Sequence, residues 1–106
     1  MTQLANVKIT VLKKAFYPEM ADQYIIEGRD IGPCPLCEEG DSYVFKGSAE
    51  MPVGLCPWAW IDIYRTISAM ASGATNSSWN NKPNQEVVCC TDGVRPVTFL
   101  VERIEE

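Results

Sequence analysis

The sequence predicts an α+β fold, in which a mostly antiparallel sheet of about four strands has two helices packed on it. Three observations indicate this fold: a period-two segment near the N-terminus, one segment of helical periodicity, and two apolar runs near the C-terminus joined by a turn signal. The 106 residues (1–106) form a single domain, because two domains would each be too small to hold a core.

The N-terminal half of the chain is expected to contain two strands and a short helix. Apolar and polar residues alternate over 7–11, which predicts a strand with one wet face. A helix is expected to follow from Pro18, because proline suits the first helical position and acidic residues follow it. Residues 29–42 are rich in glycine and proline and predict a loop, and 43–46 a short strand.

The C-terminal half is expected to contain a longer helix and a hairpin. An apolar stripe with spacings of three and four predicts the helix, which should end at Ser72-Gly73. Residues 86–90 and 97–101 predict two strands connected through Thr91-Asp92-Gly93. The stripe consists of Trp60, Ile63, Tyr64, Ile67, Met70 and Ala71.

Composition disfavours several classes of partner. The net charge is −5 and the nine lysines and arginines are scattered apart from the pair Lys13-Lys14, so neither nucleic acid nor an anionic membrane surface is an expected partner. We expect no membrane span, because no apolar run approaches the ~18 residues it requires. The N-terminus does not resemble a signal peptide and the cysteine count of five is odd, so we expect a cytoplasmic protein with reduced thiols.

Cys56 precedes a proline at the start of the longer helix. Pro57 favours the first helical position, which places Cys56 at or near the N-cap. Unbonded N–H groups and the helix dipole favour a thiolate there, as a nucleophile or a metal ligand. The alternative is a small apolar side chain packed under the helix start.

Cys34 and Cys37 form a C-x-x-C motif within the loop. A thioredoxin-type motif would require a helix directly after it, but Gly40-Asp41 interrupts the chain three residues later. The context is more typical of a metal knuckle, in which a tight turn directs two thiolates at one ion.

Cys89 and Cys90 are adjacent on a predicted strand, so their side chains should point to opposite faces. One of them, with Cys34, Cys37 and Cys56, would complete four sulfurs, a set that suits zinc or iron. The chain has no histidine, which excludes imidazole-ligated zinc and the Cys-His and Ser-His-Asp catalytic systems.

Three other polar residues are candidate cofactor-binding groups. Asp41 and Asp92 each neighbour a glycine, so each either fixes a turn or serves as a ligand. Arg95 either binds an anionic group or offsets Asp92. Trp58 and Trp60 are expected to pack in the core.

The segment Pro52-x-Gly54-Leu55-Cys56-x-x-Ala59-Trp60-x-x-Ile63-Tyr64 resembles the central signature of a family of short prokaryotic proteins of unknown function. The likeness covers most of the chain and continues in Cys34 with Gly40-Asp41, in Cys90-x-Asp92, and in Arg95-Pro96-Val97-x-Phe99 with Arg103. That family's pattern has three cysteines, which correspond to Cys34, Cys56 and Cys90. The resemblance therefore selects Cys90 over Cys89, and it leaves the fourth metal position to Cys37, Asp92, Asp41, water or a substrate.

Three functional hypotheses follow. The first is a metal- or cofactor-binding protein whose Cys34, Cys56 and Cys90 converge with Cys37 at the helix start. The second is a thiol-dependent redox or nucleophilic enzyme that uses Cys56. The third is a structural or interaction module with packing cysteines, which would bind a protein partner or form a homodimer. Separately, Trp79 of a polar tract either anchors a flexible loop or contacts a partner subunit.

Overall fold

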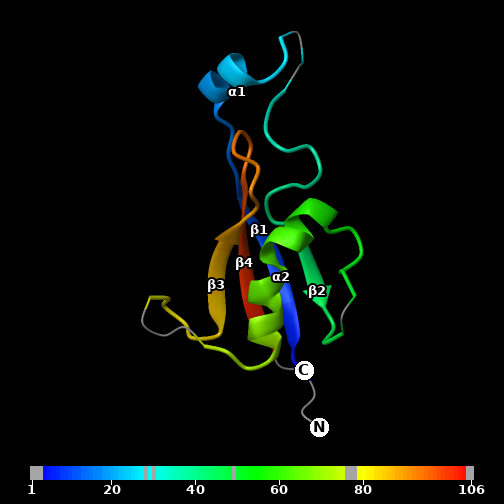
Figure 1. Ribbon diagram of the computed structural model, residues 1–106. Coiled ribbons are helices and arrows are strands. Elements are labelled where there is room, and N and C mark those ends of the chain that lie inside the picture. The colour runs from blue at the N-terminus through cyan, green and yellow to red at the C-terminus, as the bar shows by residue number, and fades with distance from the viewer. Residues whose placement is uncertain (1–3, 28, 30, 49, 76–78, 105–106) are drawn as a thin grey trace.

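A four-stranded antiparallel sheet in the order β2-β1-β4-β3 organises the computed structural model, which describes residues 4–27, 29, 31–48, 50–75 and 79–104 (Figure 1). The α+β prediction is confirmed. The strands are β1 (Asn6–Lys14), β2 (Ser42–Phe45), β3 (Gln85–Cys89) and β4 (Val97–Ile104), and the helices are α1 (Pro18–Tyr24) and α2 (Pro57–Ala71). The predicted C-terminal hairpin is present, with Val87 opposite Leu100.

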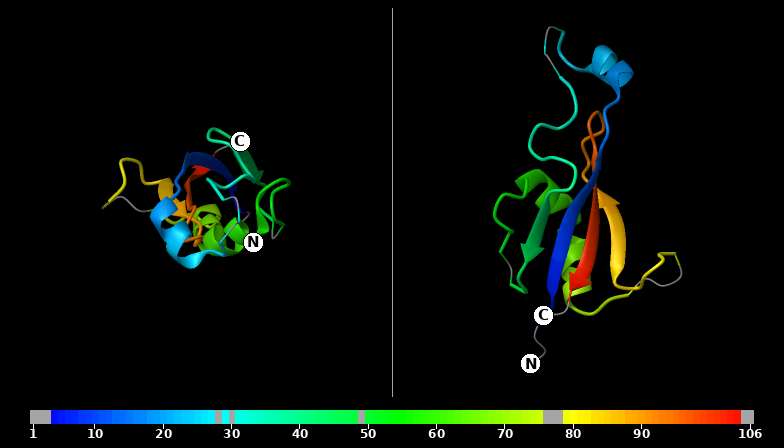
Figure 2. Two further views of the ribbon diagram at one scale, coloured as in Figure 1. Left: turned by 90° about the horizontal axis from the view of Figure 1, so that it is seen from above. Right: turned by 180° about the vertical axis from the view of Figure 1, so that it is seen from behind.

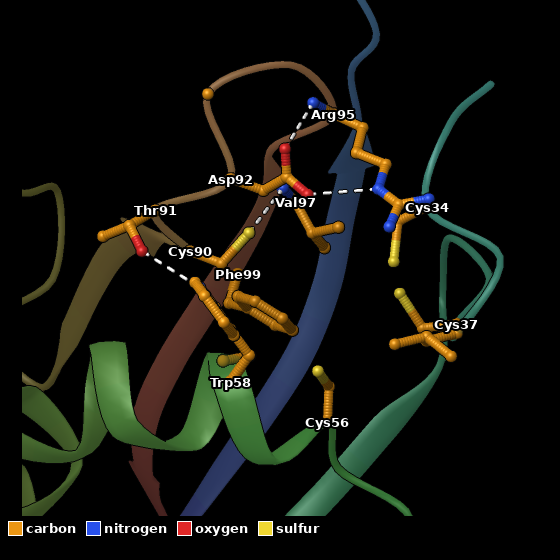
Figure 3. A pocket seen from close by; sticks show the side chains of 13 residues that line it. Cys34, Cys37, Cys56, Trp58, Cys90, Thr91, Asp92, Arg95, Val97 and Phe99 are labelled. Carbon is orange, nitrogen blue, oxygen red and sulfur yellow. Dashed lines mark hydrogen bonds and ion pairs between the residues drawn. The ribbon is translucent and has the colours of Figure 1, made fainter. Parts of the chain in front are cut away.

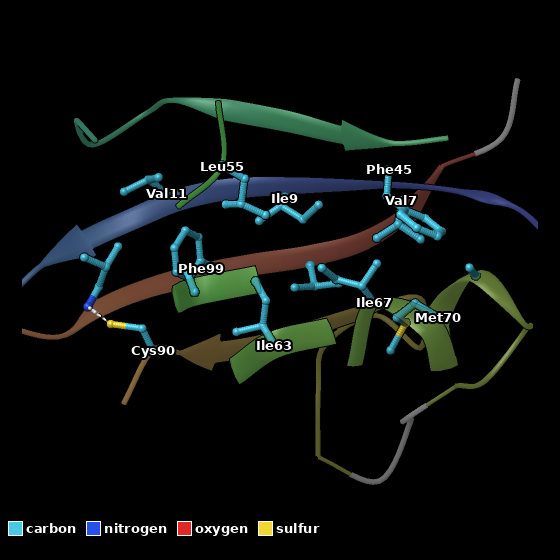
Figure 4. Packing of buried hydrophobic residues seen from close by; sticks show 14 residues of the cluster. Val7, Ile9, Val11, Phe45, Leu55, Ile63, Ile67, Met70, Cys90 and Phe99 are labelled. Atoms are coloured by element: carbon cyan, nitrogen blue, oxygen red, sulfur yellow. Dashed lines mark hydrogen bonds between the residues drawn. The ribbon is translucent and has the colours of Figure 1, made fainter. Parts of the chain in front are cut away.

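The core lies between one face of the sheet and α2 (Figure 4). Alternate residues of the two central strands point to this face, because side chains in a strand alternate with period two. Helix α2 covers them with the stripe that the sequence predicted. The main contributors are Val7, Ile9 and Val11 of β1, Val97, Phe99 and Val101 of β4, and Ile63, Ile67 and Met70 of α2, each at most 4% exposed.

Aromatic residues connect α2 to the edge strand β2. The ring centroid of Trp60 lies 6.0 Å from that of Phe45 and 4.8 Å from that of Tyr64. The packing predicted for Trp60 is therefore confirmed, although Tyr64 is more exposed than a core position.

Helix α1 is not placed as expected. It lies beyond the end of the sheet instead of over its face (Figures 1 and 2). Of its seven residues, all described, only Ala21 is buried. Hydrogen bonds from Ala15 N to Pro96 O (2.9 Å) and from Tyr17 N to Val94 O (2.8 Å) join the chain before the helix to the β3–β4 connection. These bonds carry the helix past the region that α2 covers.

Neither helix of the described residues is long and apolar enough to cross a membrane.

Candidate functional site

A pocket of about 510 Å³ lies at the N-terminal end of α2 (Figure 3). We call it the thiol pocket, because four of the five cysteines line it. They come from three segments: the loop before β2, the start of α2, and the connection between β3 and β4. The lining residues are Cys34, Leu36, Cys37, Cys56, Trp58, Ala59, Cys90, Thr91, Asp92, Gly93, Arg95, Val97 and Phe99.

Cys56 is the N-cap of α2, as the sequence predicted, and Pro57 is the first helical residue. A tight turn precedes it, in which Gly54 has a φ of +88°, a value that L side chains rarely adopt. The Cys56 side chain forms no capping hydrogen bond and the first turn carries no acidic residue. Among the residues that the structure describes, no side chain accepts a hydrogen bond from the first N–H groups of this helix, which leaves this end of the pocket electropositive.

Cys34 and Cys37 form a thiol pair in the loop before β2. Their sulfurs point toward one another (Figure 3). No helix follows the motif within the described residues 31–41, so the prediction of a loop instead of a thioredoxin-type helix is confirmed.

Lys14 anchors this loop, a role that the sequence did not indicate. Its ammonium donates a hydrogen bond to the Cys37 carbonyl (2.7 Å), and its backbone N–H donates to Glu39 Oε2 (3.0 Å). A register shift between Val11 and Lys13 makes this possible, because it pairs Lys14 with Val97 on the covered face of the sheet.

The surroundings of Cys37 favour its neutral thiol. Burial is the main cause that raises its pKa from 9.0 to about 11, and the neighbouring Cys34 adds to this by charge and by hydrogen bonding. Lys14 acts in the opposite direction. The pKa of Tyr43 is also raised, first by burial and then by charges that include Cys37, Cys56 and Cys34.

Cys90 and Cys89 point to opposite faces of the sheet, as strand alternation predicts. Cys90 is 9% exposed and belongs to the core, where its Sγ accepts a hydrogen bond from Val97 N (3.3 Å). Cys89 is exposed and is the one cysteine of the five, all described, that does not line the pocket.

Asp92 and Arg95 lie together on the wall formed by the β3–β4 connection (Figure 3). Asp92 Oδ1 accepts hydrogen bonds from Val94 N and Arg95 N, both at 3.0 Å, and Oδ2 accepts one from Arg95 Nε at 3.1 Å. Burial alone would raise the pKa of Asp92, but these donors and the Arg95 charge outweigh it and lower the pKa. Asp92 therefore fixes the turn and orients Arg95, and neither of its oxygens is left without a donor.

Asp41 does not line the pocket. Its carboxylate accepts a hydrogen bond from Glu38 N (2.9 Å) and its carbonyl accepts one from Val11 N (2.8 Å), which is the turn role considered for it. A role of Asp41 as a cofactor ligand stays a prediction, and its charge contributes to raising the pKa of Cys37 and of Tyr43.

Trp58 is not a core residue, and the prediction that it packs there is wrong. It is 65% exposed at the pocket rim, where its Nε1 donates to Thr91 Oγ1 (3.1 Å). Thr91 N and Oγ1 both donate to Asp62 Oδ2, at 2.8 and 3.0 Å. This network ties the first turns of α2 to the segment that carries Cys90. The available sequence signal was the spacing of four between Trp58 and Asp62 on one helix face.

Within the part of the chain that the structure describes, no three cysteine or carboxylate side chains stand close enough together to hold a metal ion. The predicted four-thiolate set therefore shares a pocket without forming a preassembled metal centre.

Comparisons with family models, with curated proteins and with solved structures give no match. The family resemblance stays a prediction that depends on its motifs.

Proposed function

We propose that this protein binds a small organic molecule or cofactor in the thiol pocket, with cysteine side chains in contact with the bound molecule. The observation that carries the proposal is a pocket of about 510 Å³ bordered by four cysteines from three segments. Small-molecule sites are typically clefts of roughly 300–1,000 Å³ with mainly apolar walls and a few placed polar groups. Here Val97 and Phe99 supply apolar surface, and Asp92 and Arg95 supply the polar groups.

The thiols add to the apolar character of these walls. With a pKa of about 11, Cys37 presents an uncharged S–H group at neutral pH. A neutral cysteine behaves as a small, polarisable apolar side chain with a weak donor. The protein therefore loses little hydration when the apolar body of a ligand enters the pocket.

A metal site is the second candidate, because Cys34, Cys37 and Cys56 line one pocket at the start of α2. A zinc or iron ion among their thiolates would offset the repulsion that Cys34 exerts on ionised Cys37. The three side chains would have to rotate toward one another, since no such group is preassembled among the described residues.

The third candidate function is an enzyme that uses Cys56 as its nucleophile and binds its substrate in the same pocket. The exposed Trp79 remains the candidate contact for a protein partner or a second copy of the chain.

Binding can be tested with 8-anilinonaphthalene-1-sulfonate, an aromatic anion whose fluorescence rises in apolar surroundings. Reduced, chelator-treated protein is titrated with this probe, and each cysteine is then alkylated with iodoacetamide and quantified by peptide mass spectrometry. The proposal predicts saturable binding that slows alkylation of Cys56 and Cys34 and leaves the exposed Cys89 unchanged.

Two tryptophan variants provide a matched control. Trp58→Ala removes an exposed side chain from the pocket rim, and Trp79→Ala removes one of similar exposure that lies outside it. Weaker probe binding in Trp58→Ala alone supports the proposal. Equal effects in both variants, or equal protection of Cys89, would overturn it. If one equivalent of zinc, added without probe, protects Cys34, Cys37 and Cys56 together, the metal candidate is favoured instead.

A further inference from the structure

Arg95 brings hydrogen-bond donors into the thiol pocket that the protein itself does not use. Its Nε donates to Asp92 Oδ2 (3.1 Å), and its backbone N–H donates to Asp92 Oδ1 (3.0 Å). Among the described residues, no hydrogen bond or ion pair reaches the two terminal nitrogens of the guanidinium. The outer edge of the guanidinium is therefore available to a ligand.

Asp92 holds this guanidinium in a fixed orientation. The backbone N–H groups of Val94 and Arg95 hold Oδ1 of this carboxylate in the turn, which fixes where Oδ2 meets the Arg95 guanidinium. The Arg95 side chain is 32% exposed, which makes it partly screened and still accessible. An oriented arginine loses less conformational freedom on binding than a freely rotating one.

The opposite side of the pocket has the same electrostatic sign. It contains the N-terminal end of the 15-residue α2, where Cys56 provides no capping bond and no acidic residue occupies the first turn. Asp92 is the one carboxylate among the lining residues, and both of its oxygens already accept hydrogen bonds. The pocket thus offers donors to an incoming anion, and its single acid is engaged.

From this arrangement we propose that the ligand of the thiol pocket carries an anionic group, such as a carboxylate, sulfonate or phosphate, that binds the outer edge of the Arg95 guanidinium. The inference rests on the proposed function and specifies the class of molecule bound. Such groups accept two parallel N–H bonds from one guanidinium, which gives orientation as well as affinity.

A pair of probes isolates the charge. 8-Anilinonaphthalene-1-sulfonate has an uncharged counterpart, N-phenyl-1-naphthylamine, which has the same rings without the sulfonate. Arg95→Gln is expected to weaken binding of the anionic probe by about tenfold or more and to change binding of the neutral probe less than about twofold. Arg95→Lys, which keeps the charge without the planar fork, should restore part of the loss.

Arg65→Gln is the matched control, because it removes the same charge from an exposed position of α2 outside the pocket. It should leave the affinities of both probes unchanged. If Arg95→Gln leaves the anionic probe unaffected while both probes still bind in a Trp58-dependent way, this inference is wrong and the proposed function stands. If neither probe binds, or if binding ignores Trp58, the proposed function itself fails. An equal loss of both probes in Arg95→Gln would show that Arg95 only maintains the shape of the pocket, which also overturns the inference.

Discussion

The neighbours of Cys37 allow one substitution to lower its pKa and another to raise it. Cys34 raises the pKa of Cys37 through its charge and through a hydrogen bond, and Lys14 lowers it. Cys34→Ala should therefore move the pKa down from about 11, although not to 9.0, because burial is the largest cause and remains. Lys14→Met should move the pKa further up.

The effect is large enough to measure as a rate, because the thiolate is the form that reacts. At pH 8 a thiol of pKa about 11 is ionised in about one molecule in a thousand, against about one in ten for a pKa of 9.0. Cys37 in the folded protein should therefore react up to about a hundredfold more slowly than a thiol of pKa 9.0. Each unit by which Cys34→Ala lowers the pKa should raise this reaction rate about tenfold.

The assay is iodoacetamide alkylation of reduced, chelator-treated protein between pH 7 and about 11, with each cysteine quantified by peptide mass spectrometry. A thiol with a pKa raised on folding stabilises the fold below 9.0, and this contribution is lost as the pH rises from there through about 11. Unfolding midpoints measured over the same range should fall accordingly. Lys13→Met is the matched control, since Lys13 pairs with Thr98 while Lys14 pairs with Val97 on the covered face. A shift in the same direction for Cys34→Ala and Lys14→Met, or an equal shift for Lys13→Met, would refute this account of the loop.

Three further predictions concern the scaffold of the pocket. Ile67→Ala, at a residue with 0% exposure, should lower the free energy of unfolding by about 3 kcal/mol in urea titrations, whereas Ile61→Ala at 76% exposure should change it by less than about 0.5 kcal/mol. Gly54→Ala should lower the free energy of unfolding by about 1–2 kcal/mol, because φ is +88° there. Gly93→Ala should lower it less, because a Cβ at Gly93 would meet open space and φ is not positive. Equal losses in the two variants would contradict the strain argument. Asp92→Asn should lower the free energy of unfolding at pH 7. The difference from the unsubstituted protein should shrink as the pH falls below 3.8, because a carboxylate with a lowered pKa loses its stabilising contribution on protonation. A difference that is independent of pH in acid unfolding curves would count against the ionic role.

Local chemistry accounts for the parts of the fold that the sequence predicted well. A proline after Cys56 marks the start of α2, and the period of the apolar residues marks its buried face, because both signals act within one or two turns. Strand alternation likewise separates Cys89 from Cys90. These rules act locally and do not bring distant segments together; the pairing of the strands places four cysteines around one pocket.

The features that were missed depend on contacts between distant segments. The bulge in β1 that places Lys14 beside the 34–37 loop is a property of its pairing with β4, and nothing near Lys14 in the chain indicates it. Trp58 is a residue type usually found in a core, but its ring lies at the pocket rim and its indole N–H donates a hydrogen bond to Thr91. Helix α1 has seven residues and buries one of them, so its own packing does not fix its position. The hydrogen bonds of the residues just before it do.

The charge distribution also limits which anions the pocket can recognise. With a net charge of −5, the protein as a whole repels an approaching anion, and the Asp92–Arg95 pair has no net charge at long range. Affinity therefore has to come from short-range terms, namely the directed N–H groups of Arg95 and the burial of apolar surface against residues such as Phe99 and Val97. An inorganic anion gains only the first of these terms, whereas an organic anion with an apolar body gains both. If the pocket binds anions as proposed, it should therefore select amphipathic acids at contact although it attracts little at a distance.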